Sequence, residues 1–185
     1  MVLVSCDLRR PMIGEFFGLS EQVGLTSVLL GQQTLTEAVR PVPGFDRLSL
    51  LPAGPVPSNP AEMLSSARAA EVFAQLRAHF DLVLVDSPPV LPVTDAAVLS
   101  RYADGTLMLV AAGQTRRTDL HRAVERLDQV RAAILGIVFN KVTRQTGRYY
   151  GYTYTYKPYP ADRVPSHARG LNGSGVERER QGMES

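Results

Sequence analysis

The sequence feature that most constrains the fold is a run of four aliphatic residues, Leu82–Val85, that ends at Asp86 and is followed by two prolines. Four aliphatic residues without polar alternation are typical of a strand buried on both faces, as in a parallel sheet. Pro88 and Pro89 then prevent the run from continuing as a regular element. Ligands of open parallel sheets bind outside the carboxyl ends of the strands, so Asp86 is expected at the ligand-binding edge. Taken alone, the run fits equally well a carboxylate that only caps the following turn.

Strand and helix patterns alternate along the first 140 residues. Further strands are predicted within residues 1–7, 48–51, 106–111 and 135–139. Between them the sequence predicts short helical turns in 14–33 and a brief helix over 34–40. It also predicts one helix from the Asn59 cap to Phe80 and another over 94–102. A longer helix is predicted to be capped by Thr118, with its buried side including Val130 and Ile134. This alternation predicts an α/β fold, a parallel sheet with helices on both faces and right-handed crossovers.

Composition and charge exclude several classes of function. The formal net charge is only +2, with Lys and Arg spread along the chain, which argues against a nucleic-acid partner. A single cysteine, Cys6, gives no disulfide framework. No apolar run reaches eighteen residues and no signal peptide is recognisable, so a cytoplasmic protein is expected. His79, His121 and His167 have no metal-ligand spacing and are expected to be ordinary surface or helix residues.

Polar side chains follow three of the predicted strands, namely Asp7, Asp86 and Asn140. Two carboxylates at one edge of a sheet repel each other unless a cation lies between them. Oxygen ligands beside a phosphate site suit Mg²⁺, which binds few carboxylates and keeps several waters. The amide of Asn140 offers a donor and an acceptor, as recognition of a purine requires. These residues predict a nucleotide–Mg²⁺ site.

Six of the seven tyrosines lie close together after the last predicted strand: Tyr149, Tyr150, Tyr152, Tyr154, Tyr156 and Tyr159. Such a segment suits either phosphorylation or an adhesive interface, because tyrosine is enriched at interfaces. Residues 161–185 are polar and rich in Gly, Ser, Arg and Glu, and they are predicted to be disordered.

Several motifs together resemble those of bacterial tyrosine kinases, the autokinases of capsule and exopolysaccharide systems, which are P-loop NTPases related to MinD and ParA ATPases. Val2–Pro11 resembles the family's Walker A′ motif and Leu82–Pro89 its Walker B motif. The match continues in Leu51–Gly54, Pro57–Pro60, Glu62–Leu64 and Val93–Ala96, and the tyrosine cluster resembles the family's autophosphorylation sites. The resemblance covers about residues 2–159.

The resemblance implies roles for particular residues. Asp86 would hold Mg²⁺ through water, and Asp7 would contact the metal or assist the attacking hydroxyl. Asn140 would contact adenine, and the clustered tyrosines would accept the γ-phosphoryl group of ATP, usually from a neighbouring subunit. Arg9 is a candidate phosphate contact, although an arginine at a strand exit is more often solvated or ion-paired. Asp95 is expected to cap its own helix.

Two departures from the family pattern bear on activity. Ser5 stands where the Walker A′ motif of the family carries another aspartate. No GxxxxGK[ST] loop, the element that cradles phosphates, occurs in the 185 residues. In the family this loop follows a strand inside the sheet, upstream of Walker A′. The expectation is therefore that the N-terminal P-loop strand is missing or supplied by a partner, that strand edges are left open, and that this chain binds ATP poorly.

The resemblance thus implies an ATP- and Mg²⁺-dependent protein-tyrosine autokinase that regulates polysaccharide biosynthesis and export. Its parts would be a nucleotide-binding domain over residues 1–145, a tyrosine cluster over 146–160 and a tail over 161–185. Expected partners are a membrane adaptor with a Wzz-like chain-length domain at the inner face of the cell membrane, further copies of the chain docked through the tyrosine segment, and a cognate tyrosine phosphatase. The alternatives are a MinD/ParA-like ATPase without kinase activity and a non-catalytic regulatory module.

Overall fold

The structure is a computed structural model that describes residues 1–143. The six clustered tyrosines, the tail and the predicted boundaries at residues 145 and 160 lie outside the described residues. No helix in the described part of the chain has the length and apolar character needed to cross a bilayer.

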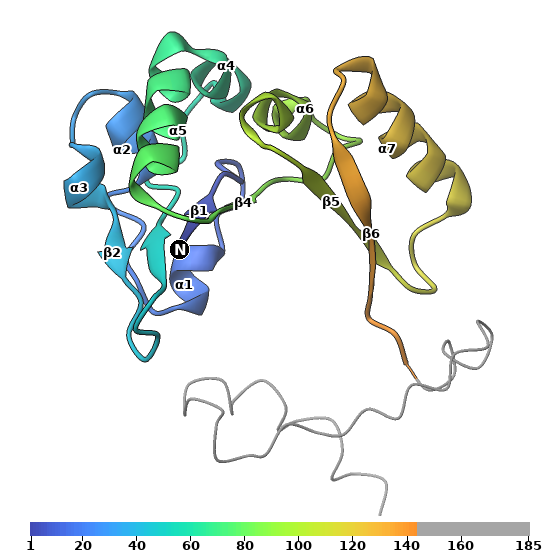
Figure 1. The fold of residues 1–185 in the computed structure, drawn as a ribbon, viewed down its shortest axis with the longest axis horizontal. Coiled ribbons are helices and arrows are strands. Elements are labelled where there is room, and N and C mark those ends of the chain that lie inside the picture. The colour runs from blue at the N-terminus through green and yellow to red at the C-terminus, as the bar shows by residue number, and fades with distance from the viewer. Residues whose placement is uncertain (144–185) are drawn as a thin grey trace, which may run out of the picture. The chain divides into compact units, whose positions relative to one another are not determined.

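Four strands form the first sheet, in the order β2 (Arg40–Pro41), β3 (Ser49–Leu51), β1 (Val2–Ser5) and β4 (Val83–Asp86) (Figure 1). Strand β1 lies between β3 and β4 and is parallel to both. The two-residue strand β2, which the sequence did not predict, pairs antiparallel with β3. The α/β class and the parallel pairing are therefore as predicted.

The remaining strands, β5 (Thr106–Ala111) and β6 (Ile134–Asn140), form a separate parallel pair. In the described residues β4 pairs only with β1, and β5 pairs only with β6. The strands thus make two sheets instead of one continuous sheet, and both β4 and β5 keep one unpaired edge. Open strand edges were expected from the missing P-loop strand.

Seven α-helices and one 3₁₀ turn connect the strands in the described residues. They are α1 (Ile13–Phe16), α2 (Leu25–Leu29), α3 (Leu35–Ala38), α4 (Pro60–Ser65), α5 (Ala67–His79), α6 (Asp95–Leu99), η1 (Ser100–Tyr102) and α7 (Arg117–Gln129). The prediction of a single helix from Asn59 to Phe80 is wrong, because the chain breaks at Ser66. Ser66 is extended (ψ 158°) and its side chain accepts a hydrogen bond from the N–H of Ala69 at 3.1 Å, which caps α5.

Helix α7 also differs from its prediction at both ends. It begins at Arg117, with Arg116 as the N-cap residue, instead of being capped by Thr118. Val130, predicted to be buried, is the C-cap residue and 40% exposed, while Ile134 already belongs to β6. Helical spacing alone does not locate the residue at which a helix ends.

The first sheet supplies the main hydrophobic core. Its fully buried residues come from the strands, from α2 and from the helices between β3 and β4: among them are Val2, Val4, Leu25, Leu51, Leu64, Val72 and Leu76. A smaller cluster forms where α7 packs on the second sheet through Met108, Ala123 and Leu127. Helix α6 belongs with the first core, since Leu99 is buried in it and Tyr102 stacks on Phe73 with ring centroids 4.6 Å apart.

Apolar side chains remain exposed beside the unpaired edges. Leu82 and Leu84 of the β4 segment are 53% and 49% exposed, so this run is not buried on both faces as predicted. In the second sheet, apolar side chains that alternate along the strands with those packed on α7 are exposed as well: Leu107, Leu109, Leu135, Ile137 and Phe139. Exposed apolar patches of this kind mark surfaces that other polypeptide covers.

Candidate functional site

Asp7 and Asp86 lie at the carboxyl end of neighbouring parallel strands. Ser5, the last residue of β1, is the register partner of Asp86, the last residue of β4. The N–H of Cys6 donates to the carbonyl of Asp86 at 2.8 Å, and Asp7 follows directly. The structure therefore brings together the two carboxylates that the sequence singled out.

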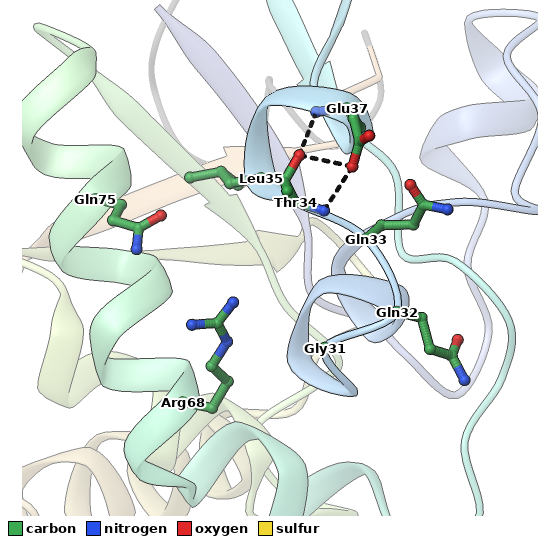
Figure 2. A pocket seen from close by; sticks show the side chains of 8 residues that line it. All are labelled: Gly31, Gln32, Gln33, Thr34, Leu35, Glu37, Arg68 and Gln75. Carbon is green, nitrogen blue, oxygen red and sulfur yellow. Dashed lines mark hydrogen bonds between the residues drawn. The ribbon is translucent and has the colours of Figure 1, made fainter.

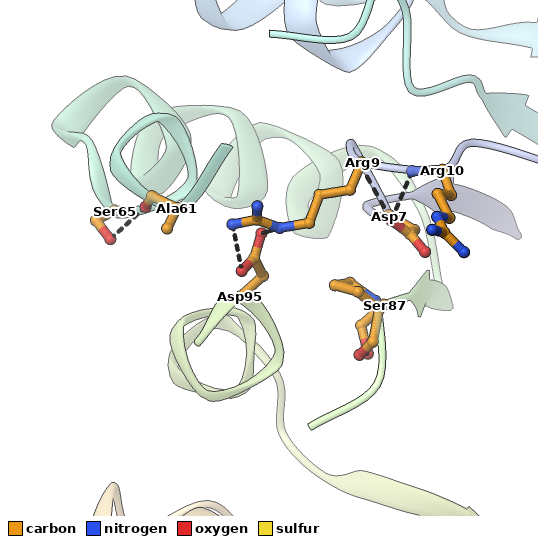
Figure 3. A network of polar contacts seen from close by, with 8 residues as sticks. Asp7, Arg9, Arg10, Ala61, Ser65, Ser87 and Asp95 are labelled. Carbon is orange, nitrogen blue, oxygen red and sulfur yellow. Dashed lines mark hydrogen bonds and ion pairs between the residues drawn. The ribbon is translucent and has the colours of Figure 1, made fainter. Parts of the chain in front are cut away.

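The two carboxylates differ in their environment. Burial raises the pKa of Asp86, and the negative charge of Asp7 raises it further. Asp86 accepts no side-chain hydrogen bond from the described residues. Oδ1 of Asp7 accepts hydrogen bonds from the backbone N–H groups of Arg9 and Arg10 at 3.1 and 3.0 Å, which fixes this carboxyl group, while Oδ2 has no partner among residues 1–143 (Figure 3). Both carboxylates thus keep oxygen atoms available to a cation.

Ser5 adds an unsatisfied oxygen at the same place. Its side chain is fully buried, and Oγ has no hydrogen-bond partner in the described residues. A buried hydroxyl without a partner is unfavourable unless water or a ligand completes it. Oxygen donors alone, without nitrogen or sulfur ligands, suit a hard cation such as Mg²⁺.

No group of three or more His, Cys, Asp or Glu residues among residues 1–143 could hold a metal ion. Two carboxylates by themselves hold a divalent cation only weakly, with water as the remaining ligands. They do match the usual protein contribution to a Mg²⁺ ion that also binds substrate phosphates. The residues present therefore fit Mg²⁺ together with a nucleotide.

Arg9 makes an ion pair with Asp95, the first residue of α6. Nε and Nη2 of Arg9 each lie 3.2 Å from one carboxylate oxygen of Asp95 (Figure 3). The Asp95 side chain is fully buried, and that of Arg9 is 40% exposed. Asp95 was expected to cap its helix, but its side chain pairs with Arg9, and Thr94 occupies the N-cap position without a side-chain hydrogen bond.

Asn140 ends β6 and so belongs to the second sheet. Its Oδ1 accepts the N–H of Lys141 at 2.8 Å, and its carbonyl accepts the N–H of Ala112 at 2.8 Å. No described hydrogen bond joins Asn140 to Asp7 or Asp86. The expectation that three strands end on one edge of a single sheet therefore holds for the two aspartates and does not extend to Asn140.

The remaining reactive side chains have structural surroundings. Cys6 is fully buried, and burial together with the charge of Asp86 raises the pKa of its thiol, so it stays protonated. His79 Nδ1 lies 2.7 Å from the carbonyl of Gln75, one turn earlier in α5. The absence of a chemical role for these residues stays a prediction.

A separate hollow of about 360 Å³ lies between the α2–α3 connection and α5 (Figure 2). Its lining residues are Gly31, Gln32, Gln33, Thr34, Leu35, Glu37, Arg68 and Gln75. Thr34 and Glu37 form a reciprocal cap at the start of α3, and the side-chain hydrogen bond from Thr34 lowers the pKa of Glu37. Arg68 pairs with Glu71 at 3.0 Å. Figure 2 shows hydrogen bonds between Thr34 and Glu37 only, and the hollow contains neither Asp7 nor Asp86.

Comparison with characterised proteins gives close relatives. None of the known family models matches the chain. The tyrosine-protein kinase YwqD of Bacillus subtilis is 36% identical over 152 residues, which cover 82% of this chain and 64% of YwqD. The tyrosine-protein kinase Wzc of Salmonella typhimurium is 34% identical over 164 residues, which cover 88% of this chain and 22% of Wzc. The chain thus spans less than two thirds of the length of these relatives.

Solved structures show the same fold. The kinase domain of VpsO is 36% identical with a TM-score of 0.71, over 77% of this chain and 70% of that one. The kinase domain of the Escherichia coli tyrosine kinase Etk is 29% identical with a TM-score of 0.74, over 86% and 59%. MinD of Pyrococcus horikoshii, complexed with Mg-ADP, is 23% identical with a TM-score of 0.63, over 77% and 58%, and this likeness concerns the fold alone.

Proposed function

Because the chain belongs to the bacterial tyrosine kinase family, we propose that it is the catalytic part of an ATP-dependent protein-tyrosine autokinase that regulates capsular or exopolysaccharide biosynthesis and export. The observation that carries this proposal is the convergence of Asp7 and Asp86 at one end of the β1–β4 pair, with free carboxylate oxygens. Phosphoryl transfer needs mainly positioning and charge neutralisation, which such a pair supports through a cation.

Within this proposal each residue has a limited task. Bound Mg²⁺ would neutralise phosphate charge as the phosphoryl group is transferred. Asp86 would hold the ion through water, and Asp7 would contact the ion or accept the proton of the attacking tyrosine hydroxyl. Asn140 would contact the adenine once the nucleotide is bound, and Arg9 could reach a phosphate with the guanidinium nitrogen that Asp95 leaves free.

The phosphate-binding loop has to come from polypeptide outside these 185 residues, since no GxxxxGK[ST] motif occurs in them. The unpaired edges of β4 and β5, and the exposed leucines beside them, support this part of the proposal. A strand that pairs with these edges would satisfy their backbone N–H and C=O groups, and a following helix would cover the exposed apolar face.

The test compares this chain with a version that carries the loop-bearing strand and helix of a family member ahead of Met1. We expect the 185-residue chain to bind Mg-ATP with a Kd weaker than about 1 μM and to form no phosphotyrosine. The completed version should bind Mg-ATP more tightly than this and should form phosphotyrosine. Submicromolar ATP binding by the chain alone would contradict the proposal. ATP hydrolysis without phosphotyrosine in the completed version would favour a MinD/ParA-like ATPase, and neither activity would favour a regulatory module.

The tyrosine segment is proposed to act as a charge-controlled docking segment between copies. Between residues 141 and 163 there are five Lys or Arg side chains and one Asp, and each phosphate adds about −1.5 to −2 charges. The basic segment would dock on an acidic surface of a neighbouring copy, such as its active site. It would dissociate from that surface once two or three tyrosines are phosphorylated. The proposed partners also include a membrane adaptor with a Wzz-like domain and a cognate phosphatase. The proposed location is the inner face of the cell membrane.

Changing all six clustered tyrosines to Phe or to Glu tests the docking. We expect the Phe version of the completed protein to remain assembled and the Glu version to dissociate, because only Glu adds negative charge. Light scattering coupled to size-exclusion chromatography measures the assembly. Equal assembly sizes for the two versions would rule out charge-controlled docking.

A further inference from the structure

The Arg9–Asp95 ion pair joins the two loops that carry the candidate metal ligands. Arg9 lies two residues after Asp7, in the loop that leaves β1. Asp95 begins α6, directly after the loop that leaves β4 at Asp86. The regular pairing of β1 with β4 ends at Ser5 and Asp86, and beyond that point the ion pair links the side chains of the two loops.

The Asp95 end of this link is fixed. Helix α6 packs on α4, and η1, which follows it, holds Tyr102 against Phe73. The Tyr102 hydroxyl donates to the carbonyl of Leu64 at 2.8 Å. Asp95 itself is fully buried, so its carboxylate cannot move freely to follow Arg9.

The Arg9 end is coupled to Asp7. The backbone N–H of Arg9 donates to Oδ1 of Asp7, so a shift of Arg9 moves the Asp7 carboxylate with it (Figure 3). Asp7 and Asp86 carry like charges and repel each other. A loop without the ion pair would relax in the direction that separates the two carboxylates.

We propose that the Arg9–Asp95 ion pair is a positioning device that holds Asp7 close enough to Asp86 for both carboxylates to bind one divalent cation. This inference rests on the proposed function, because it presupposes the metal site. Arg9 and Asp95 are positioning residues here, and neither has to touch the cation. The two fork-like hydrogen bonds of a guanidinium on a carboxylate define an orientation that a lysine ammonium cannot reproduce.

Electrostatics without positioning predicts the opposite result. Arg9 is a positive charge near the proposed cation, so deleting that charge should tighten cation binding if only charge matters. Loss of positioning should weaken binding, as loss of an outer-shell partner usually does. Variants that break the ion pair and keep the net charge therefore separate the two explanations, since charge alone predicts no change in binding for them and loss of positioning predicts weaker binding.

The experiment measures binding of Mn²⁺ alone to the 185-residue chain by electron paramagnetic resonance of the free ion. Arg9→Met with Asp95→Leu removes the ion pair without a net change in charge or an unpaired buried carboxylate. Arg9→Lys keeps the positive charge and loses the pair of parallel hydrogen bonds to Asp95. Arg10→Met is the control for charge, because it removes one charge from the neighbouring residue, whose side chain has no hydrogen-bond or ion-pair partner in the described part of the chain.

We expect the double variant and Arg9→Lys to bind Mn²⁺ about tenfold more weakly than the wild type, with Arg10→Met equal or tighter. Thermal unfolding without metal is measured in parallel to confirm that each variant is folded. Unchanged Mn²⁺ affinity in the folded double variant would overturn the inference and assign the ion pair a role in stability alone. A wild-type chain that binds no Mn²⁺ would overturn the proposed metal site and the inference with it.

Discussion

Gly24→Ala is expected to destabilise the chain by about 3 kcal/mol, a large part of the stability of a typical domain. Gly24 lies where the N-terminus of α2 meets the loop after β3. A Cβ atom at this position would come within 2.3 Å of the Pro52 carbonyl oxygen and 2.4 Å of the Gly54 nitrogen, both backbone atoms. Relieving the clash would disturb the hydrogen bonds from Leu25 to Pro52 and from Thr26 to Ala53, at 2.7 and 2.8 Å. Urea unfolding followed by circular dichroism measures the loss.

Gly31→Ala is the matched control for this prediction. Gly31 follows α2 with φ +71°, and a Cβ there would meet no atom within 4 Å. The left-handed backbone alone should cost about 1 kcal/mol, so this variant reports backbone strain without a clash. Equal losses for the two variants would show that the close approach of α2 to the β3 loop does not exist in solution.

Local sequence patterns were enough to locate most strands, because a buried aliphatic run has few alternatives. The runs ending at Asp86, Ala111 and Asn140 all became strands. The break at Ser66 was missed because Ser66 interrupts a pattern in which both flanking segments are helical. Its extended conformation depends on how α4 and α5 each pack on the core, which spacing along the chain does not encode.

The division into two sheets could not be read from the runs themselves. An aliphatic strand has the same sequence whether or not its edges are paired and its faces are covered. Leu84 was therefore expected to be buried, and its side chain is 49% exposed. What did indicate the open edges was the absence of a phosphate-binding motif in an otherwise recognisable set of motifs.

The candidate site was predictable in part. Asp7 and Asp86 each follow an aliphatic run, and parallel pairing brings such positions to one edge. The partner of Arg9 was not predictable, since Asp95 lies 86 residues away. The available signal was the charge itself: an aspartate directly before the apolar residues 96–99 suggests a buried carboxylate that needs a cationic partner.

Asp86→Asn is expected to lower autophosphorylation by about 100-fold or more in the completed protein described under Proposed function, while raising the stability of the metal-free fold. Loss of the carboxylate that holds the ion through water weakens the transition-state charge stabilisation that the metal supplies, and each 1.4 kcal/mol is tenfold in rate. Stability changes in the opposite direction because Asn carries no charge. The pKa of Asp86 is raised by burial and by Asp7, so the folded state disfavours the ionised carboxylate.

The sign of the pH dependence follows from the raised pKa. A carboxyl group with a folded-state pKa above its unfolded value contributes stability at low pH and loses it as the pH rises through the folded pKa. The gain in unfolding free energy of Asp86→Asn over the wild type should therefore grow as the pH rises above the ordinary aspartate pKa of about 3.9, and then level off. Thermal unfolding across this range measures it.

Asp81→Asn is the matched control, since Asp81 is exposed, its side chain makes no hydrogen bond or ion pair within residues 1–143, and it undergoes the same chemical change. It should leave phosphotyrosine formation unchanged. Mg²⁺ or Mn²⁺ should raise the unfolding temperature of the wild type and of Asp81→Asn but not of Asp86→Asn, because binding to the folded state alone stabilises it. If Asp86→Asn kept its response to the metal, the cation would have to bind elsewhere, and the raised pKa of Asp86 would be a consequence of burial without function.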